Sequence, residues 1–247
     1  MSYAPLSRGS RGKRIPPSIR DSFYSPCVSL GRRELTSVAR LQHAAWYAGQ
    51  ASWVEFRFDL LQRDGRQCVE GIEERVRMFA RFEHRIAVCH RSADGLNAEQ
   101  RMEVIGRAIV AGCNAVDIDW QEERDYPAEL YSALARRGVK RVRSCHLSKP
   151  LPSPKALRGL IARMRHDAPF LVKVVMPCYS QSQMRMVLSC YDGRSDLLLI
   201  AAGQAGRTSR VVATRHGAPF SYVHLGSPTG PGQISLAQYR KAFRNGL

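Results

Sequence analysis

Eight short apolar segments recur along the chain, and each is followed by a longer segment with the periodicity of an amphipathic helix. The predicted strands are Cys27–Leu30, Trp53–Leu61, Arg85–His90, Ala115–Trp120, Arg141–His146, Phe170–Met176, Leu197–Ala202 and Ser221–Leu225. Helices are predicted near 34–48, 68–81, 97–111, 127–137, 154–166, 180–190, 208–215 and 235–243. Eight strand–helix repeats without a linker predict an α/β fold, and more narrowly a closed (β/α)8 TIM barrel. An open, doubly wound sheet is less favoured, because no G-x-G-x-x-G motif follows the first segment.

Residues 1–25 differ in composition from the rest of the chain. They contain Ser, Gly, Pro and five cations against a single acid, Asp21, which is the composition of a flexible segment. We therefore predict a flexible basic tail at 1–25 and one barrel domain at 26–247. Within the barrel, Asn97 is expected to cap a helix, and Gly112 and Gly138 are expected to end helices.

The composition excludes several classes of protein. With 44% hydrophobic and 24% charged residues among 247, the chain matches a globular protein and not a disordered or collagen-like one. Its longest uncharged apolar run, around 197–203, is far shorter than the 18 or so residues that span a membrane, and residues 1–25 hold no apolar signal segment. The seven cysteines are scattered without a C-x-x-C pair, so we expect buried thiols rather than disulfides or a zinc site. These features predict a cytoplasmic protein with no membrane partner and no metal.

The formal net charge of +17 allows two interpretations. Only six of the 38 cations are lysines, and the arginines are spread along the whole chain. A basic surface attracts nucleic acid as well as small anions. Because the chain has no dense basic block and no aromatic–basic RNA motif, an arginine-rich solvated surface is favoured and a nucleic-acid partner is not.

The second predicted strand carries charges on one face. Side chains alternate along a strand, so Glu55, Arg57 and Asp59 share one side while the apolar residues between them share the other. In a barrel this pattern predicts an internal polar cluster near the mouth. We interpret Asp59 as part of a self-satisfied ion network, and Glu55 and Arg57 as ligand contacts.

The sixth predicted strand has a lysine, Lys173, in the middle of an apolar run. A lysine there is costly unless it is paired or deprotonated. Desolvation lowers the pKa of an amine, and a neutral amine can attack a carbonyl to form a Schiff base. The alternatives are a lysine that reaches the surface from an edge strand and one locked in an ion pair. Because a closed barrel has no edge strand, we favour the Schiff-base hypothesis.

A histidine, His146, ends the preceding strand, where catalytic groups project in a barrel. Its ordinary pKa lets it take up and return a proton near neutrality. Neighbouring strands would place it beside Lys173, which favours proton abstraction next to a carbonyl. The other six histidines have no such setting and are interpreted as structural or surface residues: His43, His84, His90, His166, His216 and His224.

Two glycine-containing segments follow the last two strands. Residues 203–210 supply backbone amides and the planar guanidinium of Arg210, which can bind a carboxylate. Residues 229–233 form a predicted loop over the mouth. The residues alone leave carboxylate and phosphate binding equally open, because loops in these positions often bind phosphate in barrels.

In this order, the segments make the chain similar to the type I 3-dehydroquinate dehydratases from about Cys27 onward, over about nine-tenths of its length. The motifs that carry the resemblance are Glu55-x-Arg57-x-Asp59, Arg91, Val116-Asp117-Ile118-Asp119, Ser144-x-His146, Val172-Lys173-Val174, Gly206 through Ser209-Arg210, and Pro231-Gly232-Gln233. Each motif is short, and their joint order and spacing are specific.

The resemblance implies a homodimeric carbon–oxygen lyase of the shikimate pathway, in the biosynthesis of chorismate and aromatic amino acids, with neither metal nor organic cofactor. It implies that Lys173 forms an imine with the C3 ketone of 3-dehydroquinate. His146 would then remove a C2 proton and help to expel the C1 hydroxyl as water, and hydrolysis of the imine would release 3-dehydroshikimate. Arg210 would hold the substrate carboxylate. Further substrate contacts are implied for Glu55, Arg57, Arg91, Thr229 and Gln233.

The chain departs from the family pattern at several places. Leu147 stands where the family usually has Asp or Asn, Ala202 where many members have Met, and Thr229 where Ser is common. The loop after Arg91 is shorter than the family's, and the glutamate that orients the family's histidine has no clear match, so that Asp94 is the candidate for that role. A catalytically weakened or repurposed Schiff-base barrel is therefore the alternative function, ahead of a basic nucleic-acid-binding protein.

Overall fold

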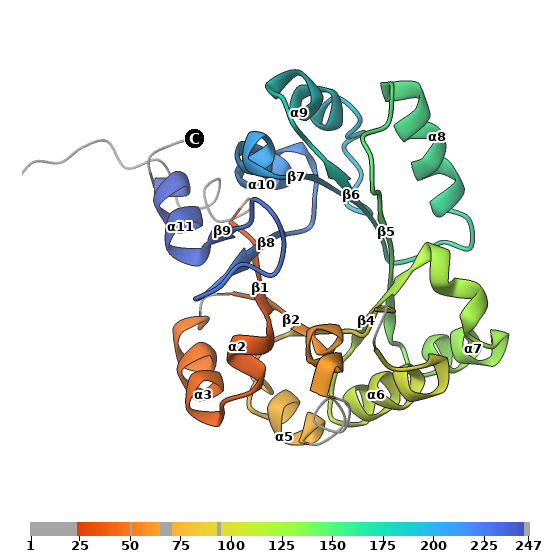
Figure 1. The fold of residues 1–247 in the computed structure, drawn as a ribbon, viewed down its shortest axis with the longest axis vertical. Helices are drawn as coiled ribbons and strands as arrows, with labels where there is room; N and C mark the ends of the chain where they lie inside the picture. The colour runs from red at the N-terminus through yellow and green to blue at the C-terminus, as the bar shows by residue number, and fades with distance from the viewer. Residues whose placement is uncertain (1–23, 50, 65–70, 93–94, 245–247) are drawn as a thin grey trace, which may run out of the picture.

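The computed structural model describes residues 24–49, 51–64, 71–92 and 95–244, and its strands are all parallel to their partners. The strands are β1 (Pro26–Leu30), β2 (Trp53–Arg57), β3 (His84–Val88), β4 (Ala115–Asp119), β5 (Lys140–His146), β6 (Leu171–Pro177), β7 (Leu197–Ala202), β8 (Ser221–His224) and the short β9 (Ile234–Ser235). They curl into a ring with the helices outside it (Figure 1). The predicted α/β barrel is confirmed.

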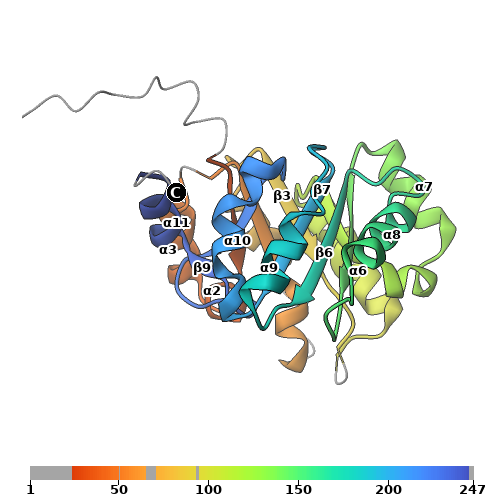
Figure 2. The same ribbon diagram turned by 90° about the horizontal axis from the view of Figure 1, so that it is seen from above.

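The helices connect successive strands and cover the outer face of the ring. They are α2 (Arg32–Leu35), α3 (Val38–Tyr47), α5 (Ile72–Arg77), α6 (Ala98–Val110), α7 (Ala128–Arg136), α8 (Pro154–Met164), α9 (Gln181–Leu188), α10 (Arg207–Val212) and α11 (Leu236–Arg244). Short 3₁₀ helices are η1 (Phe58–Asp64), η2 (Trp120–Asp125), η3 (Gln204–Gly206) and η4 (Ala213–His216). Figure 2 shows α8, α9 and α10 on the outer side of β6 and β7.

The ring has a seam between β7 and β8. Within the described residues the hydrogen-bonded ladder runs from β7 through β6, β5, β4, β3, β2 and β1 to β8 and β9, and does not pass directly from β7 to β8. At the mouth, loops join the two sides, because the amide of Gly203 donates to the carbonyl of Pro231 at 3.2 Å. Gly232, with φ of 71°, approaches so closely that an added Cβ would lie 2.2 Å from the Gly203 carbonyl oxygen. The loop after β8 is thereby fixed over the end of β7.

The local predictions fail in two places and hold at the predicted cap. The second strand ends at Arg57 and not at Leu61, because the chain turns into η1, whose three-residue period buries both Phe58 and Leu61. The helix expected over 34–48 is divided into α2 and α3, and the Ser37 side chain caps α3 by accepting from the amide of Arg40. Asn97 caps α6 as predicted, in a reciprocal capping box with Gln100.

Side-chain alternation along the strands separates two kinds of core. Outward residues such as Val172, Val174 and Met176 of β6 pack with the apolar faces of α8 and α9. Inward residues form a separate apolar cluster inside the ring, which includes Leu171, Leu198 and Phe220. The inward side of the strands becomes polar toward their carboxyl ends, which is where barrel enzymes place their functional groups.

Many arginines have structural partners, which accounts for part of the positive charge. The guanidinium of Arg85 donates to the carbonyls of Phe79, Ala80 and Phe82 after α5 and to that of Gly112 after α6. Other arginines likewise donate to carbonyls near helix ends: Arg143 to Met164 and His166, Arg158 to Ser189, and Arg75 to Leu35. Since the last carbonyls of a helix have no partner within it, these contacts favour arginine for a reason unrelated to nucleic acid.

Most of the predicted basic tail, 1–23, and Cys68 lie outside the described residues. Tyr24 is described and packs against the rings of Tyr239 and Phe243 of α11, tilted to the first and edge-on to the second, while the carbonyl of Ser25 accepts from the amide of Ser221. The six described cysteines are buried free thiols, as predicted. Among the described helices, none has the length and apolar character required to cross a bilayer.

Gly206→Ala should lower the free energy of unfolding by about 1–3 kcal/mol. An added Cβ would lie 2.0 Å from the carbonyl oxygen of Ala201 on β7, so that backbone must move. Gly106→Ala is the matched control, because a Cβ at this position in α6 meets nothing within 4 Å and should stabilise by about 0.5–1 kcal/mol. Urea denaturation measures both, and an unchanged stability for Gly206→Ala would contradict the packing described.

Candidate active site

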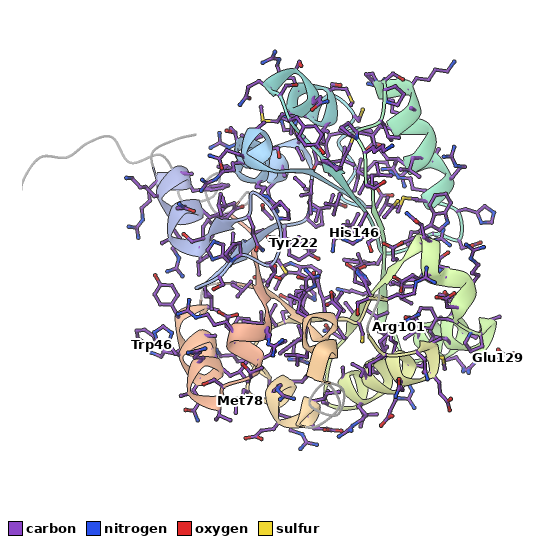
Figure 3. The ribbon with its side chains drawn as sticks, in the orientation of Figure 1. Trp46, Met78, Arg101, Glu129, His146 and Tyr222 are labelled. Atoms are coloured by element: carbon purple, nitrogen blue, oxygen red, sulfur yellow. The ribbon has the colours of Figure 1, made fainter. Side chains whose placement is uncertain are left out.

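One interior layer of the barrel is built from polar side chains. Four side chains face inward from alternate strands, and each residue is at most 5% exposed: Glu55 of β2, Asp117 of β4, Lys173 of β6 and Tyr222 of β8. Alternate strands supply the layers of such barrels, which usually consist of branched apolar residues. In Figure 3 Tyr222 and His146 lie on the inner side of the ring, whereas Trp46 and Glu129 lie on outer helices. A polar layer at this depth needs internal partners for every charge.

The amine of Lys173 lies at the centre of this layer and is paired with carboxylates. Its Nζ is 2.6 Å from Oδ2 of Asp117 and 3.7 Å from Oε1 of Glu55, and it lies 4.8 Å from the ring centre of Tyr222. Burial alone would lower the pKa of Lys173, but Asp117 and Glu55 outweigh it and raise that pKa. The expectation of a neutral amine from desolvation is therefore wrong for the free protein. The reason is Asp117, whose charge the sequence argument about Lys173 left out.

The carboxylates of the layer are held by further contacts. Burial would raise the pKa of Asp117, but Lys173 and His90 lower it well below its ordinary value. Glu55 accepts a short hydrogen bond at Oε2 from the Ser29 hydroxyl, and Ser29 in turn lies 2.8 Å from the Thr229 hydroxyl of the mouth loop. The layer is thus connected to the loop above it.

His146 projects from the carboxyl end of β5, as predicted, and has a carboxylate partner. Parallel pairing sets Ser144 opposite Lys173, so His146 follows two residues later on the same inward side. Its Nδ1 donates to Oδ2 of Asp119 at 3.0 Å. Burial, together with the charges of Lys173 and His90, lowers the pKa of His146 despite Asp119. His146 is therefore neutral at pH 7, with one nitrogen fixed by Asp119 and the other available.

His90 is a second imidazole at the site. It follows β3, its side chain is 13% exposed, and its ring centre lies 5.2 Å from that of His146. Its Nε2 donates to Oδ1 of Asp117 at 3.2 Å. The sequence predicted a structural or surface residue here, and the structure places His90 inside, beside Asp117 and His146. It lies two residues beyond the end of β3, whereas His146 is the last residue of β5.

Arg210 supplies a buried cation at the mouth. The residue is 6% exposed, its Nη2 donates to the Pro231 carbonyl at 2.9 Å, and its Nε has no hydrogen-bond partner among the described residues. Burial lowers the pKa of Arg210 to about 10. A buried guanidinium without a carboxylate partner is suited to binding an anion.

The other side of the mouth is formed by Arg57 and the loop after β8. Arg57 donates from Nε and Nη2 to Asp59 at 2.9 and 2.6 Å, which is the ion network expected for Asp59, and from Nη1 to the Thr229 carbonyl at 3.3 Å. Gln233 accepts at Oε1 from the Thr229 amide at 2.6 Å. These contacts hold the loop above the polar layer.

A cavity of about 170 Å³ brings most of the predicted site residues together. It is lined by Glu55, Arg57, His146, Lys173, Val175, Ile200, Ala202, Arg210, Tyr222, Thr229, Gly230, Pro231 and Gln233. Arg91 is not among them, because its side chain is 56% exposed and lies 3.5 Å from Asp125. Asp94, the candidate for orienting His146, lies outside the described residues. In the described residues Asp119 makes that contact.

Asp117 and Asp119 belong to a sequence motif for which no role was predicted. In the structure Asp117 contacts Lys173 and His90, and Asp119 contacts His146. The signal was the alternation of charge along β4, the same pattern that identified Glu55 and Arg57 on β2. The described residues contain no group of three His, Cys, Asp or Glu side chains arranged to hold a metal ion.

Comparison with known proteins gives the family. A sequence model described as Type I 3-dehydroquinase matches residues 26–245. The chain belongs to the type I 3-dehydroquinase family. Among relatives named 3-dehydroquinate dehydratase, that of Archaeoglobus fulgidus is 27% identical over 199 residues, covering 78% of this chain and 89% of the relative. That of Methanothermobacter thermautotrophicus is 26% identical over 215 residues, covering 87% and 94%.

Solved structures agree on the fold. The 3-dehydroquinate dehydratase of Geobacillus kaustophilus is similar with a TM-score of 0.75 at 16% identity, over 90% of each chain. The carboxyl transferase domain of Rhizobium etli pyruvate carboxylase is also similar, with a TM-score of 0.62 at 12% identity, over 91% of this chain and 44% of that one. Because a dehydratase and a carboxyl transferase share this barrel, the structural similarity shows the fold and not the activity. Membership of the type I 3-dehydroquinase family confirms the predicted family and its enzyme class, a hydro-lyase.

Lys173→Met should lower the free energy of unfolding at pH 7 by about 3–5 kcal/mol, because it leaves buried carboxylates without their cation. Because folding lowers the pKa of Asp117, its contribution to the free energy of unfolding is present at pH values above its pKa in the unfolded chain. Because folding raises the pKa of Lys173, its contribution is present at pH values below its pKa in the unfolded chain. The pair therefore stabilises throughout the neutral range.

The difference from the wild type should narrow as the pH falls, because Asp117 of the variant can then take up a proton. Lys155→Met, at an exposed position on α8, is the control and should change stability by less than about 0.5 kcal/mol. Urea denaturation at several pH values measures both variants. Equal stability of the two variants at pH 7 would contradict the ion pair.

Proposed function

We propose that the protein dehydrates 3-dehydroquinate to 3-dehydroshikimate through an imine on Lys173. The observation that carries the proposal is an enclosed amine that shares one small cavity with a neutral imidazole and an anion-binding guanidinium. The type I 3-dehydroquinase family and its relatives' names supply the substrate. Each chemical step then has a described group that can perform it.

In the first step Lys173 must lose a proton and attack the C3 ketone, which becomes a carbinolamine and then, by loss of water, a protonated imine. The carboxylates of Asp117 and Glu55 lie where the positive charge of that imine forms. They stabilise the iminium cation in the same place as the ammonium, without reorganisation. A protonated imine withdraws electrons more strongly than the ketone, so the neighbouring C2 proton becomes more acidic.

In the second step His146 acts as base and then as acid. Its lowered pKa leaves it neutral at pH 7, and Asp119 fixes its orientation. His146 takes the C2 proton to give an enamine, and returns a proton to the C1 hydroxyl as that group leaves as water. Hydrolysis of the remaining imine releases product and regenerates the amine, so the net reaction is the loss of one water.

Substrate binding is assigned to the mouth. Arg210 would pair with the substrate carboxylate, which satisfies the buried Nε. Glu55, Arg57, Thr229 and Gln233 line the cavity and offer hydrogen bonds to hydroxyls. Arg91 would reach the substrate only if it left Asp125.

The proposal also covers the cofactor requirement, oligomeric state, location and pathway that the family resemblance implies. The reaction needs neither metal nor organic cofactor, since the lysine itself supplies the electron sink. The enzyme would be a cytoplasmic homodimer of the shikimate pathway, serving aromatic amino acid biosynthesis. Sedimentation of the full chain tests the dimer.

The direct test is turnover of 3-dehydroquinate, followed by the ultraviolet absorbance of the conjugated enone product. Lys173→Met should abolish turnover, while Lys155→Met should leave it unchanged. Borohydride with substrate should inactivate the wild type and leave an adduct on Lys173, detected by mass spectrometry. Turnover without an adduct on Lys173 would refute the imine. An adduct without turnover would instead support the weakened or repurposed barrel.

Asp119→Asn should lower kcat by roughly 100-fold or more, because the amide can no longer hold His146 in the tautomer of a base. The borohydride adduct should still form, since Lys173 keeps its own partners. Asp192→Asn, which alters a surface pair with Arg165, is the control and should keep wild-type kcat. A wild-type kcat in Asp119→Asn would show that another group orients His146.

A further inference from the structure

His90 is a buried ionisable group that the proposed mechanism does not use. The cavity is lined by His146 and not by His90, which lies behind it at 5.2 Å between ring centres. Its side chain is nevertheless only 13% exposed and is hydrogen-bonded to the carboxylate that anchors Lys173. Burial of an imidazole at this place requires a reason beyond filling space, which an apolar residue would do at lower cost.

An imidazole and an ammonium group share one carboxylate, that of Asp117. Oδ1 of Asp117 accepts from Nε2 of His90 at 3.2 Å, and Oδ2 accepts from Nζ of Lys173 at 2.6 Å. Four charged or titratable groups act on His90 from the elements around it: Asp117 of β4, Asp59 of η1, His146 of β5 and Lys173 of β6. A positive charge on His90 would thus weaken the net attraction between the ammonium of Lys173 and its surroundings at Asp117.

The two histidines have opposite protonation preferences although both are buried. Burial would lower the pKa of His90, but Asp117 and Asp59 raise it. For His146, burial with the charges of Lys173 and His90 lowers the pKa. When the environments of two neighbouring groups shift their pKa values in opposite directions, one group can be charged at a pH at which the other is neutral. These surroundings therefore favour the protonated form of His90 and the neutral form of His146.

We propose that His90 is a positioning residue that, as an imidazolium on Asp117, weakens the hold of that carboxylate on Lys173 and so makes the amine easier to deprotonate. The inference rests on the proposed function, because it concerns the amine that would form the imine. It adds no covalent step. The same positive charge keeps His146 in the neutral form of a base. A merely structural His90 would do neither.

Two variants separate charge from packing. His90→Gln keeps a hydrogen-bond donor for Asp117 without the charge, and His90→Phe keeps the ring volume without either. The pH dependence of reductive methylation at Lys173, followed by mass spectrometry in the full-length protein, reports its apparent pKa without turnover. Both variants should raise that pKa by about one unit, the effect of a neighbouring charge. Exposed Lys155 in the same samples is the internal control and should not change.

Kinetics supply the second measurement. The acid limb of kcat/KM on 3-dehydroquinate should move to higher pH in both variants, because removal of the cation raises the pKa values of Lys173 and His146 together. An unchanged Lys173 pKa in the folded variants, or a shift in His90→Phe alone, would overturn the inference while leaving the proposed function intact. A wild type that does not dehydrate 3-dehydroquinate would overturn the proposed function, and with it the role given to His90.

Discussion

The ion pair between Lys173 and Asp117 is the interaction on which the rest of the site depends. Its atoms are 2.6 Å apart inside a ring of strands, where both side chains are largely removed from water. A buried charge that lost its partner would be costly, so each member of the pair requires the other and requires further polar neighbours. Glu55, Tyr222 and His90 meet that need from three other strands or strand ends. The polar layer is therefore a single unit and not a set of separate contacts.

The barrel makes such a layer possible by separating its two faces. Outward side chains of the strands build the apolar core with the helices, which leaves the inward positions near the mouth free to carry polar side chains. The inward apolar cluster closes the other end of the ring below the polar layer. At the mouth, the loop after β8 is held to Gly203, Arg57 and Arg210 through its backbone carbonyls. Lys173 and His146 thus lie on strands, and the loop above them is held in place by these hydrogen bonds.

Much of this architecture could be predicted from the sequence, because strand periodicity and charge alternation are local signals. The barrel, Lys173, His146, Arg210 and the charged face of β2 follow from residues a few positions apart. The protonation state of Lys173 could not be predicted, since it depends on Asp117, which is 56 residues away in the chain. Asp94, the candidate for orienting His146, lies outside the described residues, and the contact that is described comes from Asp119 of the adjacent strand. The position of His90 beside Asp117 and His146 could not be predicted, because these contacts form only once β3, β4 and β5 are assembled.

These relations make the departures from the family pattern intelligible. Leu147 packs against the outer apolar core, and His146 is hydrogen-bonded to a strand residue, Asp119. Ala202 lines the cavity in place of a larger side chain, which leaves the amine and the imidazole unaffected. The chain therefore keeps Lys173 and His146 in one cavity, with His146 held by Asp119.

The central claim is that the ketone oxygen of the substrate leaves when Lys173 becomes bonded to C3. A single turnover of 3-dehydroquinate in water enriched in oxygen-18, with the protein in excess, tests it most directly by the mass of the product. The account predicts 3-dehydroshikimate with one solvent oxygen at C3, because hydrolysis of the imine takes that oxygen from water. Product that keeps the original ketone oxygen, at times shorter than spontaneous exchange in the absence of protein, would contradict it.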